Sequence, residues 1–206
     1  VNNGSSIFDS RPDEIDRKMT ISMKLGAIEW NDCKINFLDT PGFLDLQGDA
    51  KAALCVVESA VILVSALDGV QVGTEIMSRF VDERKVPRMF FINGMDKENV
   101  DFHKTIESVK AAFGTSVALL QIPIGSGPQF KGVVDLVTKE AYEYVKDGNG
   151  IGKKIALPPE SAEEIDALRA SLMEAIAESD EGLLNTYFEK GELSLIELRK
   201  GLAQGF

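Results

Sequence analysis

The chain has 206 residues, of which 27% are charged, and its formal net charge is −11. That length fits one large α/β domain, or one domain with a small appended domain. A surface this acidic repels phosphate backbones, and no apolar run approaches the ~20 residues of a membrane span, so we expect neither direct nucleic-acid binding nor membrane insertion. Cys33 and Cys55 lack the spacing of a metal or redox site, which favours a reducing compartment, the cytoplasm by default.

Apolar patterning divides most of the chain into alternating strands and helices. Alternating or continuous apolar residues predict strands at 20–30, 34–39, 61–68, 88–93 and 117–123. Helical spacing predicts helices between them at 49–60, 72–85 and 102–113. The last three strands are continuously apolar, which is typical of strands buried on both faces. The predicted fold class is therefore α/β, with a mostly parallel, doubly wound sheet that binds ligands beyond the carboxyl ends of its strands.

The pattern changes after residue 128. FKGVVDLVT and AYEYVKD predict short antiparallel strands, and a long amphipathic helix and two short helices follow them. We therefore predict a core domain at residues 1–128. Residues 129–206 would form a small inserted α+β subdomain with C-terminal helices that return to the core.

The first loop of interest is DTPG, at the end of the strand 34–39. The Asp39 carboxylate could hold Mg²⁺ through a bound water, and the Gly42 N–H could face a terminal phosphate. Thr20 precedes a strand and could give its hydroxyl to the same ion. Each signal is weak alone, because Thr-Pro-Gly is an ordinary turn and any strand can begin with Thr.

Two further loops have the chemistry of a purine site. In NGMD, the Asp96 carboxylate can accept two parallel N–H bonds, which guanine offers at N1 and N2 and adenine does not. Asn93 could brace this loop and touch the base edge. In GSG, the small residues 125–127 leave room for a base, and the Ser126 backbone N–H could meet a carbonyl. Asn-Gly is also an ordinary turn dipeptide, so this signal too is weak alone.

Taken together, the order and spacing of these loops resemble the translational GTPases, in particular the nucleotide-binding domain of elongation factor G and its paralogues, over residues 6–206. The resemblance implies a P-loop NTPase-like G domain that binds GTP or GDP with Mg²⁺. It implies the following roles: Thr20 and Asp39 at the metal, Gly42 at the γ-phosphate, Asn93 and Asp96 at guanine, and Gly125, Ser126 and Gly127 in the loop that supports the base. It also implies work on the ribosome, with contact to a ribosomal stalk protein through the inserted subdomain.

One departure from the family is the missing phosphate loop, since no GxxxxGK[ST] motif occurs in the sequence. The GK of DGNGIGKK lacks the first glycine and the Ser/Thr, and it does not follow a buried strand. The resemblance predicts that a strand, the phosphate loop and a helix precede Val1, and that further domains follow Phe206. Residues 1–206 alone would then bind GTP poorly and be inactive.

Two substitutions within the motifs also depart from the family. Phe43 stands where the family usually has a histidine that positions the attacking water, which a phenyl ring cannot do. We expect Phe43 to be a hydrophobic gate or a core anchor of its loop, and hydrolysis to be slow or differently triggered. Gly94 replaces a lysine that lies over the base, which predicts weaker affinity with specificity kept, and we expect Lys97 to point elsewhere.

Two functions remain open. The first is a translational GTPase with altered hydrolysis. The second is a GTPase-like protein without turnover that serves as a ribosome-binding or regulatory module. Titration with GTP and GDP separates them, because absence of binding favours the second.

Overall fold

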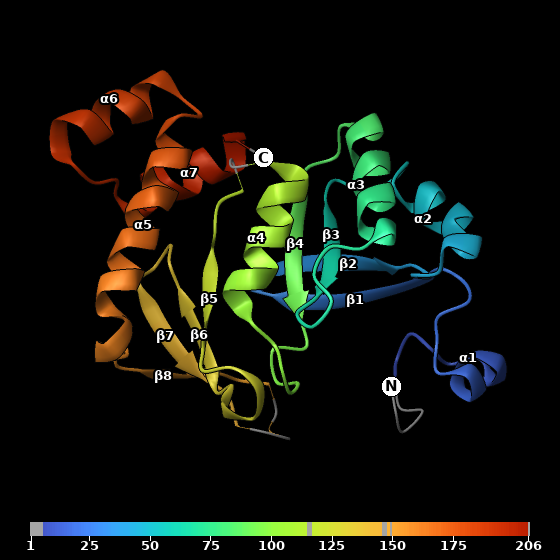
Figure 1. Cartoon of the computed structure of the whole chain (residues 1–206). Helices are drawn as coiled ribbons and strands as arrows, with labels where there is room; N and C mark the ends of the chain where they lie inside the picture. Colours follow the sequence, from blue (N-terminus) through green and yellow to red (C-terminus); the bar gives the residue numbers. More distant parts are fainter. Residues whose placement is uncertain (1–5, 115–116, 146–147, 149, 206) are drawn as a thin grey trace. The chain divides into compact units, whose positions relative to one another are not determined.

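A computed structural model describes residues 6–114, 117–145, 148 and 150–205 (Figure 1). The chain forms two compact units. Unit 1 comprises Val1–Leu63 and Gln71–Phe91, and unit 2 comprises Val64–Val70 and Ile92–Phe206. No helix among the described residues is both long enough and apolar enough to cross a membrane.

Unit 1 begins with a short helix, α1 (Pro12–Arg17), and a hairpin of β1 (Lys24–Trp30) and β2 (Cys33–Asp39). The strands are antiparallel and their register pairs Lys24 with Asp39. Asn31 and Asp32 form the two-residue turn with φ values of 47° and 60°, which suits the right-handed twist of the strands. The predicted hairpin is therefore confirmed.

Two helices complete unit 1, α2 (Gln47–Ala53) and α3 (Val72–Arg84). A 3₁₀ turn, Leu44–Leu46, precedes α2. The helix predicted at 49–60 is shorter than expected. Its end tightens into bonds from the Cys55 N–H to the Ala52 carbonyl and from the Val56 N–H to the Ala53 carbonyl. The β-branched pair Val56–Val57, which loses side-chain freedom in a helix, disfavours its continuation.

The strands β3 (Ala60–Ser65) and β4 (Arg88–Asn93) pair with each other. The Ala60 N–H bonds the Pro87 carbonyl and the Ala66 N–H bonds the Asn93 carbonyl, a constant offset that makes the pair parallel. Helix α3 is the crossover between them, as expected for the predicted α/β class.

Burial of β3 and β4 on both faces was also predicted, and this is wrong for the described chain. Alternate residues of each strand remain about half exposed or more: Val61 (58%), Leu63 (63%), Met89 (50%) and Phe91 (51%). Their neighbours Ile62 and Val64 are buried. A continuous apolar run therefore indicates that a strand can be buried on both faces. In the described residues, only one face of β3 and β4 is covered.

Unit 2 contains α4 (Phe102–Phe113) and a four-stranded antiparallel sheet. Its strands, in spatial order, are β5 (Gln121–Ile124), β6 (Gly132–Asp135), β7 (Glu140–Glu143) and β8 (Lys153–Ile155). The strand predicted at 117–123 begins only at Gln121, and its assigned partner is the antiparallel β6 rather than another parallel strand. The turn after it returns the chain at once, with the Lys131 N–H bonded to the Ile124 carbonyl at 2.9 Å.

Three helices follow this sheet, α5 (Ala162–Ala177), α6 (Glu181–Lys190) and α7 (Leu195–Gly205). One apolar core joins sheet and helices, with Leu136, Ile165 and Leu198 fully buried in it. Arg169 of α5 also donates to the carbonyls of Leu136 and Val137. The boundary near residue 128 concerns an insertion into a parent domain and stays a prediction.

Candidate functional site

The end of β2 brings two of the predicted metal-binding residues together. The Thr20 hydroxyl lies 3.5 Å from the Asp39 Oδ2 atom, and it donates at 2.8 Å to the Asp9 Oδ1 atom. A hydroxyl has one proton, so Thr20 serves one carboxylate at a time while its lone pairs stay available. We call this group of Asp9, Thr20 and Asp39 the carboxylate–hydroxyl cluster.

The charges of this cluster favour a cation. Partial burial raises the pKa of Asp39, and the nearby Asp9 charge raises it further, against the opposing effects of Thr20 and Lys24. Two carboxylates beside a hydroxyl offer hard oxygen ligands, which suit Mg²⁺. Within the part of the chain that the structure describes, no group of three or more His, Cys, Asp or Glu side chains forms a metal cage. Mg²⁺ usually keeps several waters and takes further oxygens from phosphates, so the oxygens of this cluster are chemically suitable for it.

Asp9 was missed from the sequence. It lies eleven residues before Thr20, outside any recognisable motif, and only the fold brings its carboxylate to the threonine hydroxyl. It is 9% exposed, and its backbone N–H bonds the Ser6 hydroxyl. A buried carboxylate in so polar an N-terminal stretch leaves no signal in composition or periodicity.

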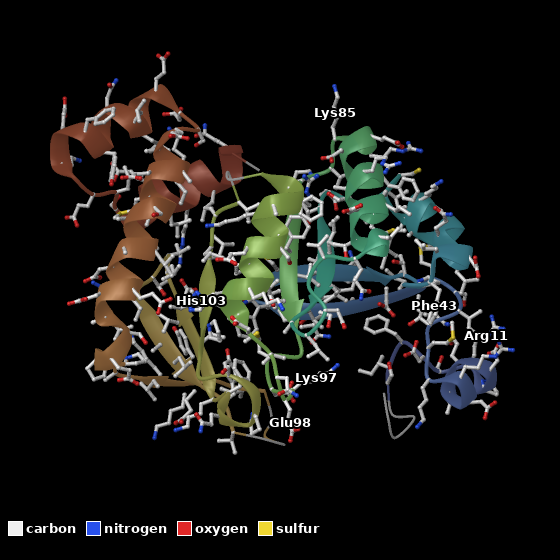
Figure 2. All side chains as sticks on the ribbon, in the orientation of Figure 1. Arg11, Phe43, Lys85, Lys97, Glu98 and His103 are labelled. Carbon is white, nitrogen blue, oxygen red and sulfur yellow. The ribbon has the colours of Figure 1, made fainter. Side chains whose placement is uncertain are left out.

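The DTPG loop that follows β2 is open to solvent beyond its proline. Pro41 is buried and Gly42 is exposed, and a Cβ atom added to Gly42 would meet nothing within 4 Å. Internal packing therefore gives no reason for a glycine here, whereas the close approach of a ligand would. Phe43 is 59% exposed, so its interpretation as a core anchor of this loop is wrong. Figure 2 shows it on the segment between β2 and α2.

The NGMD and GSG loops, both in unit 2, are joined by a backbone bond. The Gly127 N–H donates to the Met95 carbonyl at 2.9 Å. A Cβ atom on Gly127, where φ is +56°, would stand 3.2 Å from the Lys97 carbonyl oxygen. We call this pair of segments, 93–98 and 125–130, the paired base loops. Among their residues, Asn93, Asp96 and Ser126 are exposed and therefore accessible to a ligand.

Glycine conformations hold the paired base loops in shape. Gly94 has φ +82° and opens a turn closed by the Lys97 N–H on its carbonyl at 3.1 Å. Gly125 has φ +77°, and a Cβ atom there would lie 2.2 Å from the Gln129 carbonyl oxygen. No other residue type fits at Gly125 without moving the backbone.

Lys97 lies against the turn that Gly94 opens. Its stem lies along Gly94, with Cε 3.2 Å and Cδ 3.3 Å from the place where a Cβ atom of residue 94 would stand. The expectation that Lys97 does not replace the family's lysine over the base stays a prediction. Figure 2 shows Lys97 and Glu98 together at the tip of the loop that follows β4.

The predicted site residues thus fall into two groups. Thr20, Asp39 and Gly42 belong to unit 1, and the paired base loops belong to unit 2. Each group is assembled within its own unit, and a common rim for both stays a prediction.

Comparison with known proteins places this chain in a family. The model of the elongation factor Tu GTP-binding domain matches residues 1–192. The chain belongs to this family. It is therefore a translational GTPase G domain, and the resemblance seen in the sequence is confirmed.

A solved structure is similar to almost the whole of this G domain. A crystal structure of a protein from Thermus thermophilus matches with a TM-score of 0.87 and 29% sequence identity, over 97% of this chain. The match covers 30% of that protein's chain, so the G domain described here spans less than a third of its relative's length. The fold class, α/β with a parallel sheet, is confirmed by the same match.

Proposed function

We propose that this G domain binds GTP and GDP with Mg²⁺ in a translation factor similar to elongation factor G, which acts with the ribosome in the cytoplasm. Family membership supports guanine-nucleotide binding. The bond from Gly127 to Met95 carries the proposal for the site, because it fixes the two predicted base loops side by side with Asp96 exposed.

The paired base loops would bind the base through both side chains and backbone. An ionised Asp96 accepts the N1 and N2 hydrogens of guanine as two parallel bonds. Asn93 and the Ser126 N–H add polar contacts, and the glycines at 125 and 127 keep side chains out of the space that the base needs. The ammonium of Lys97 would add a positive charge at this loop where the family's usual lysine is replaced by Gly94.

The carboxylate–hydroxyl cluster would hold Mg²⁺, through the Thr20 hydroxyl and through waters on Asp39. When bound, the ion neutralises phosphate charge during transfer of the terminal phosphoryl group. The Gly42 N–H, in open space, would face the terminal phosphate. Asp9 accepts the hydrogen bond that the Thr20 hydroxyl donates, which leaves the lone pairs of that hydroxyl for the ion.

Phe43 makes slow or differently triggered hydrolysis part of the proposal. A phenyl ring neither donates nor accepts, so it cannot orient a water for attack. Its exposure fits a hydrophobic gate over the DTPG loop. The same observation favours the second candidate function, a ribosome-binding or regulatory module that binds nucleotide without turnover, or does not bind it.

Partner contacts of residues 129–206 also remain proposals. The exposed acidic residues at the start of α5, among them Glu163 and Glu164, offer a surface to a ribosomal stalk protein. The net charge of −11 disfavours direct contact of this chain with RNA.

The test is a comparison of nucleotide affinities in the full-length protein. Guanosine and inosine diphosphates differ only by the 2-amino group, so wild-type protein should bind GDP about tenfold or more tightly than IDP. Asp96→Asn should remove most of that preference. Glu98→Gln, an exposed neighbour in the same loop, should keep it.

Equal affinity of the wild-type protein for GDP and IDP would contradict the role of Asp96. Absence of binding to either GTP or GDP would favour the regulatory module. Tight GDP binding with no phosphate release from GTP on ribosomes would also favour the second candidate, in the form that binds nucleotide without turnover.

A further inference from the structure

Glu14 of α1 is the most enclosed carboxylate in unit 1, with 0% exposure. Lys24 Nζ donates to both of its oxygens, at 2.6 and 2.7 Å. The backbone N–H groups of three residues also donate to it: Arg11 and Ser22 at 3.3 Å and Ile21 at 3.2 Å. A buried carboxylate with this many donors is fully satisfied rather than strained.

The donors come from three separate pieces of the chain. Arg11 lies at the N-terminus of α1, Ile21 and Ser22 lie in the segment after α1, and Lys24 is the first residue of β1. The same segment is tied to α1 a second time, by the Met19 N–H on the Glu14 carbonyl at 3.2 Å. Residues 18–24 therefore form a loop that is held to α1 by bonds to Glu14.

Thr20 lies inside that loop, between Met19 and Ile21, both of which bond Glu14. Its own side chain points to Asp9 and Asp39 instead. At the far end of the loop, Lys24 is the cross-strand partner of Asp39 in the hairpin. The Glu14 carboxylate thus bonds the residue that follows Thr20 and the residue opposite Asp39, while its main-chain carbonyl bonds the residue that precedes Thr20.

We propose that Glu14 is the positioning residue of the carboxylate–hydroxyl cluster, which holds the Thr20 hydroxyl at the end of β2 beside Asp39. The proposal rests on the function proposed above, since the cluster is the site assigned to Mg²⁺. Glu14 itself touches neither Thr20 nor Asp39 in any described contact. Its carboxylate acts through the backbone N–H groups of Ile21 and Ser22 and through Lys24.

An ordinary buried ion pair would give a different distribution of donors. Such a pair contributes little or nothing beyond what apolar packing supplies, and its carboxylate needs only one charged partner. Here the backbone N–H groups of the two residues that follow Thr20 depend on the same carboxylate. Removal of the charge should therefore release the segment rather than merely lower the stability of the unit.

The experiment uses limited trypsin digestion of the full-length protein, followed by mass spectrometry. Arg17 and Lys18, both exposed, are cleavage sites at the entrance of the loop. Glu14→Gln keeps the size of the side chain and removes its charge, and cleavage after these residues should be about tenfold faster, the change expected from loss of one charge-assisted bond. Asp16→Asn, an exposed carboxylate on the same helix, is the matched control and should cleave like wild type.

A second readout separates positioning from simple anchoring. The Mg²⁺ concentration for half-maximal GDP affinity should rise about tenfold in Glu14→Gln, while affinity at saturating Mg²⁺ changes less than about twofold. Faster cleavage with an unchanged Mg²⁺ requirement would overturn the positioning role. Equal cleavage of Glu14→Gln and Asp16→Asn would overturn the anchor as well.

Wild-type protein provides a test that needs no variant. Hydrogen exchange at the Ile21 and Ser22 amides should be slow, because both are bonded to a buried carboxylate. Fast exchange at these amides would overturn the proposal even if Glu14→Gln fails to fold. Absence of GDP binding in the wild type would contradict the proposed function, and digestion and exchange would still decide whether Glu14 anchors the segment.

Discussion

The carboxylate–hydroxyl cluster and the paired base loops are built in different ways. In the cluster, charged and hydroxyl side chains set the positions: Asp9 bonds Thr20, and Glu14 bonds the residues beside it. In the base loops, the backbone sets the positions through Gly94, Gly125 and the bond from Gly127 to Met95. Side chains can titrate, exchange partners and bind a cation, whereas the base loops keep their turns through backbone bonds and glycines at positive φ. The difference indicates that the carboxylate–hydroxyl cluster is adaptable and that the paired base loops are preformed.

The largest effect should come from Gly125→Ala. The new Cβ atom would lie 2.2 Å from a backbone oxygen, at a φ of +77°. We expect a loss of about 3 kcal/mol in the free energy of unfolding, measured with urea. Gly42→Ala is the matched control, because a Cβ atom there meets nothing within 4 Å, and it should change stability by less than about 0.5 kcal/mol. Equal effects of the two changes would contradict the view that the backbone at Gly125 sets the conformation of the base loops.

Phe43→His tests whether the side chain at position 43 limits the rate of GTP cleavage. A histidine can orient water, so single-turnover GTP cleavage by the full-length protein on ribosomes should rise about 100-fold, equivalent to about 2.7 kcal/mol of barrier. Phe43 is 59% exposed, so stability should stay within about 0.5 kcal/mol of wild type. No gain in rate would show that another feature limits hydrolysis.

Thr20→Val removes a hydroxyl at nearly constant shape. The bond to Asp9 is lost, and we expect a loss of about 1 kcal/mol in the free energy of unfolding without metal or nucleotide. Thr138→Val serves as control, because the buried Thr138 hydroxyl has no hydrogen-bond partner among the described residues. That change should be neutral or slightly stabilising. A larger loss in the free energy of unfolding for Thr138→Val than for Thr20→Val would contradict the role of the Thr20 hydroxyl in the carboxylate–hydroxyl cluster.

Acid should weaken the support of the carboxylate–hydroxyl cluster, because protonation of Glu14 removes its charge. The Lys24 ammonium lowers the pKa of Glu14 from 4.5 to about 2, and the backbone N–H of Ile21 contributes in the same direction against the effect of burial. Because the folded pKa is the lower one, the contribution of Glu14 is present above about pH 4.5 and is lost as pH falls toward about 2. The stability gap between wild type and Glu14→Gln, from urea unfolding, should therefore narrow as pH falls from about 5.5 to about 3. A gap that stays constant over this range would contradict this.

Local pattern was enough to predict the hairpin, the helices α3 to α7 and the parallel pair of β3 and β4, because each follows from periodicity over neighbouring residues. It failed where the outcome depends on distant residues. The run VALLQIP reads equally well as a buried parallel strand or as the antiparallel strand that β5 is, and only the return of the chain at Gly125 decides. Exposure of Leu63 and Phe91 likewise depends on what covers their face.

The candidate site shows the same division. Motifs predicted Thr20, Asp39, Asn93 and Asp96 as candidates, since strand ends and turn residues have sequence signatures. Asp9 and Glu14 could not be predicted, because an acidic residue in an acidic N-terminal stretch gives no sign of burial. The stem of Lys97 along Gly94 was also missed, since the path of a four-carbon side chain depends on the local turn that Gly94 opens.

The backbone bond between Gly127 and Met95 has a kinetic consequence. Neither base loop can move away from the other without breaking this bond, so opening of the loops to release a bound base would have to break it. Residence time, more than encounter rate, would then respond to substitutions in either segment. A nucleotide-exchange partner that displaced one loop would thereby also remove the bond that supports the other.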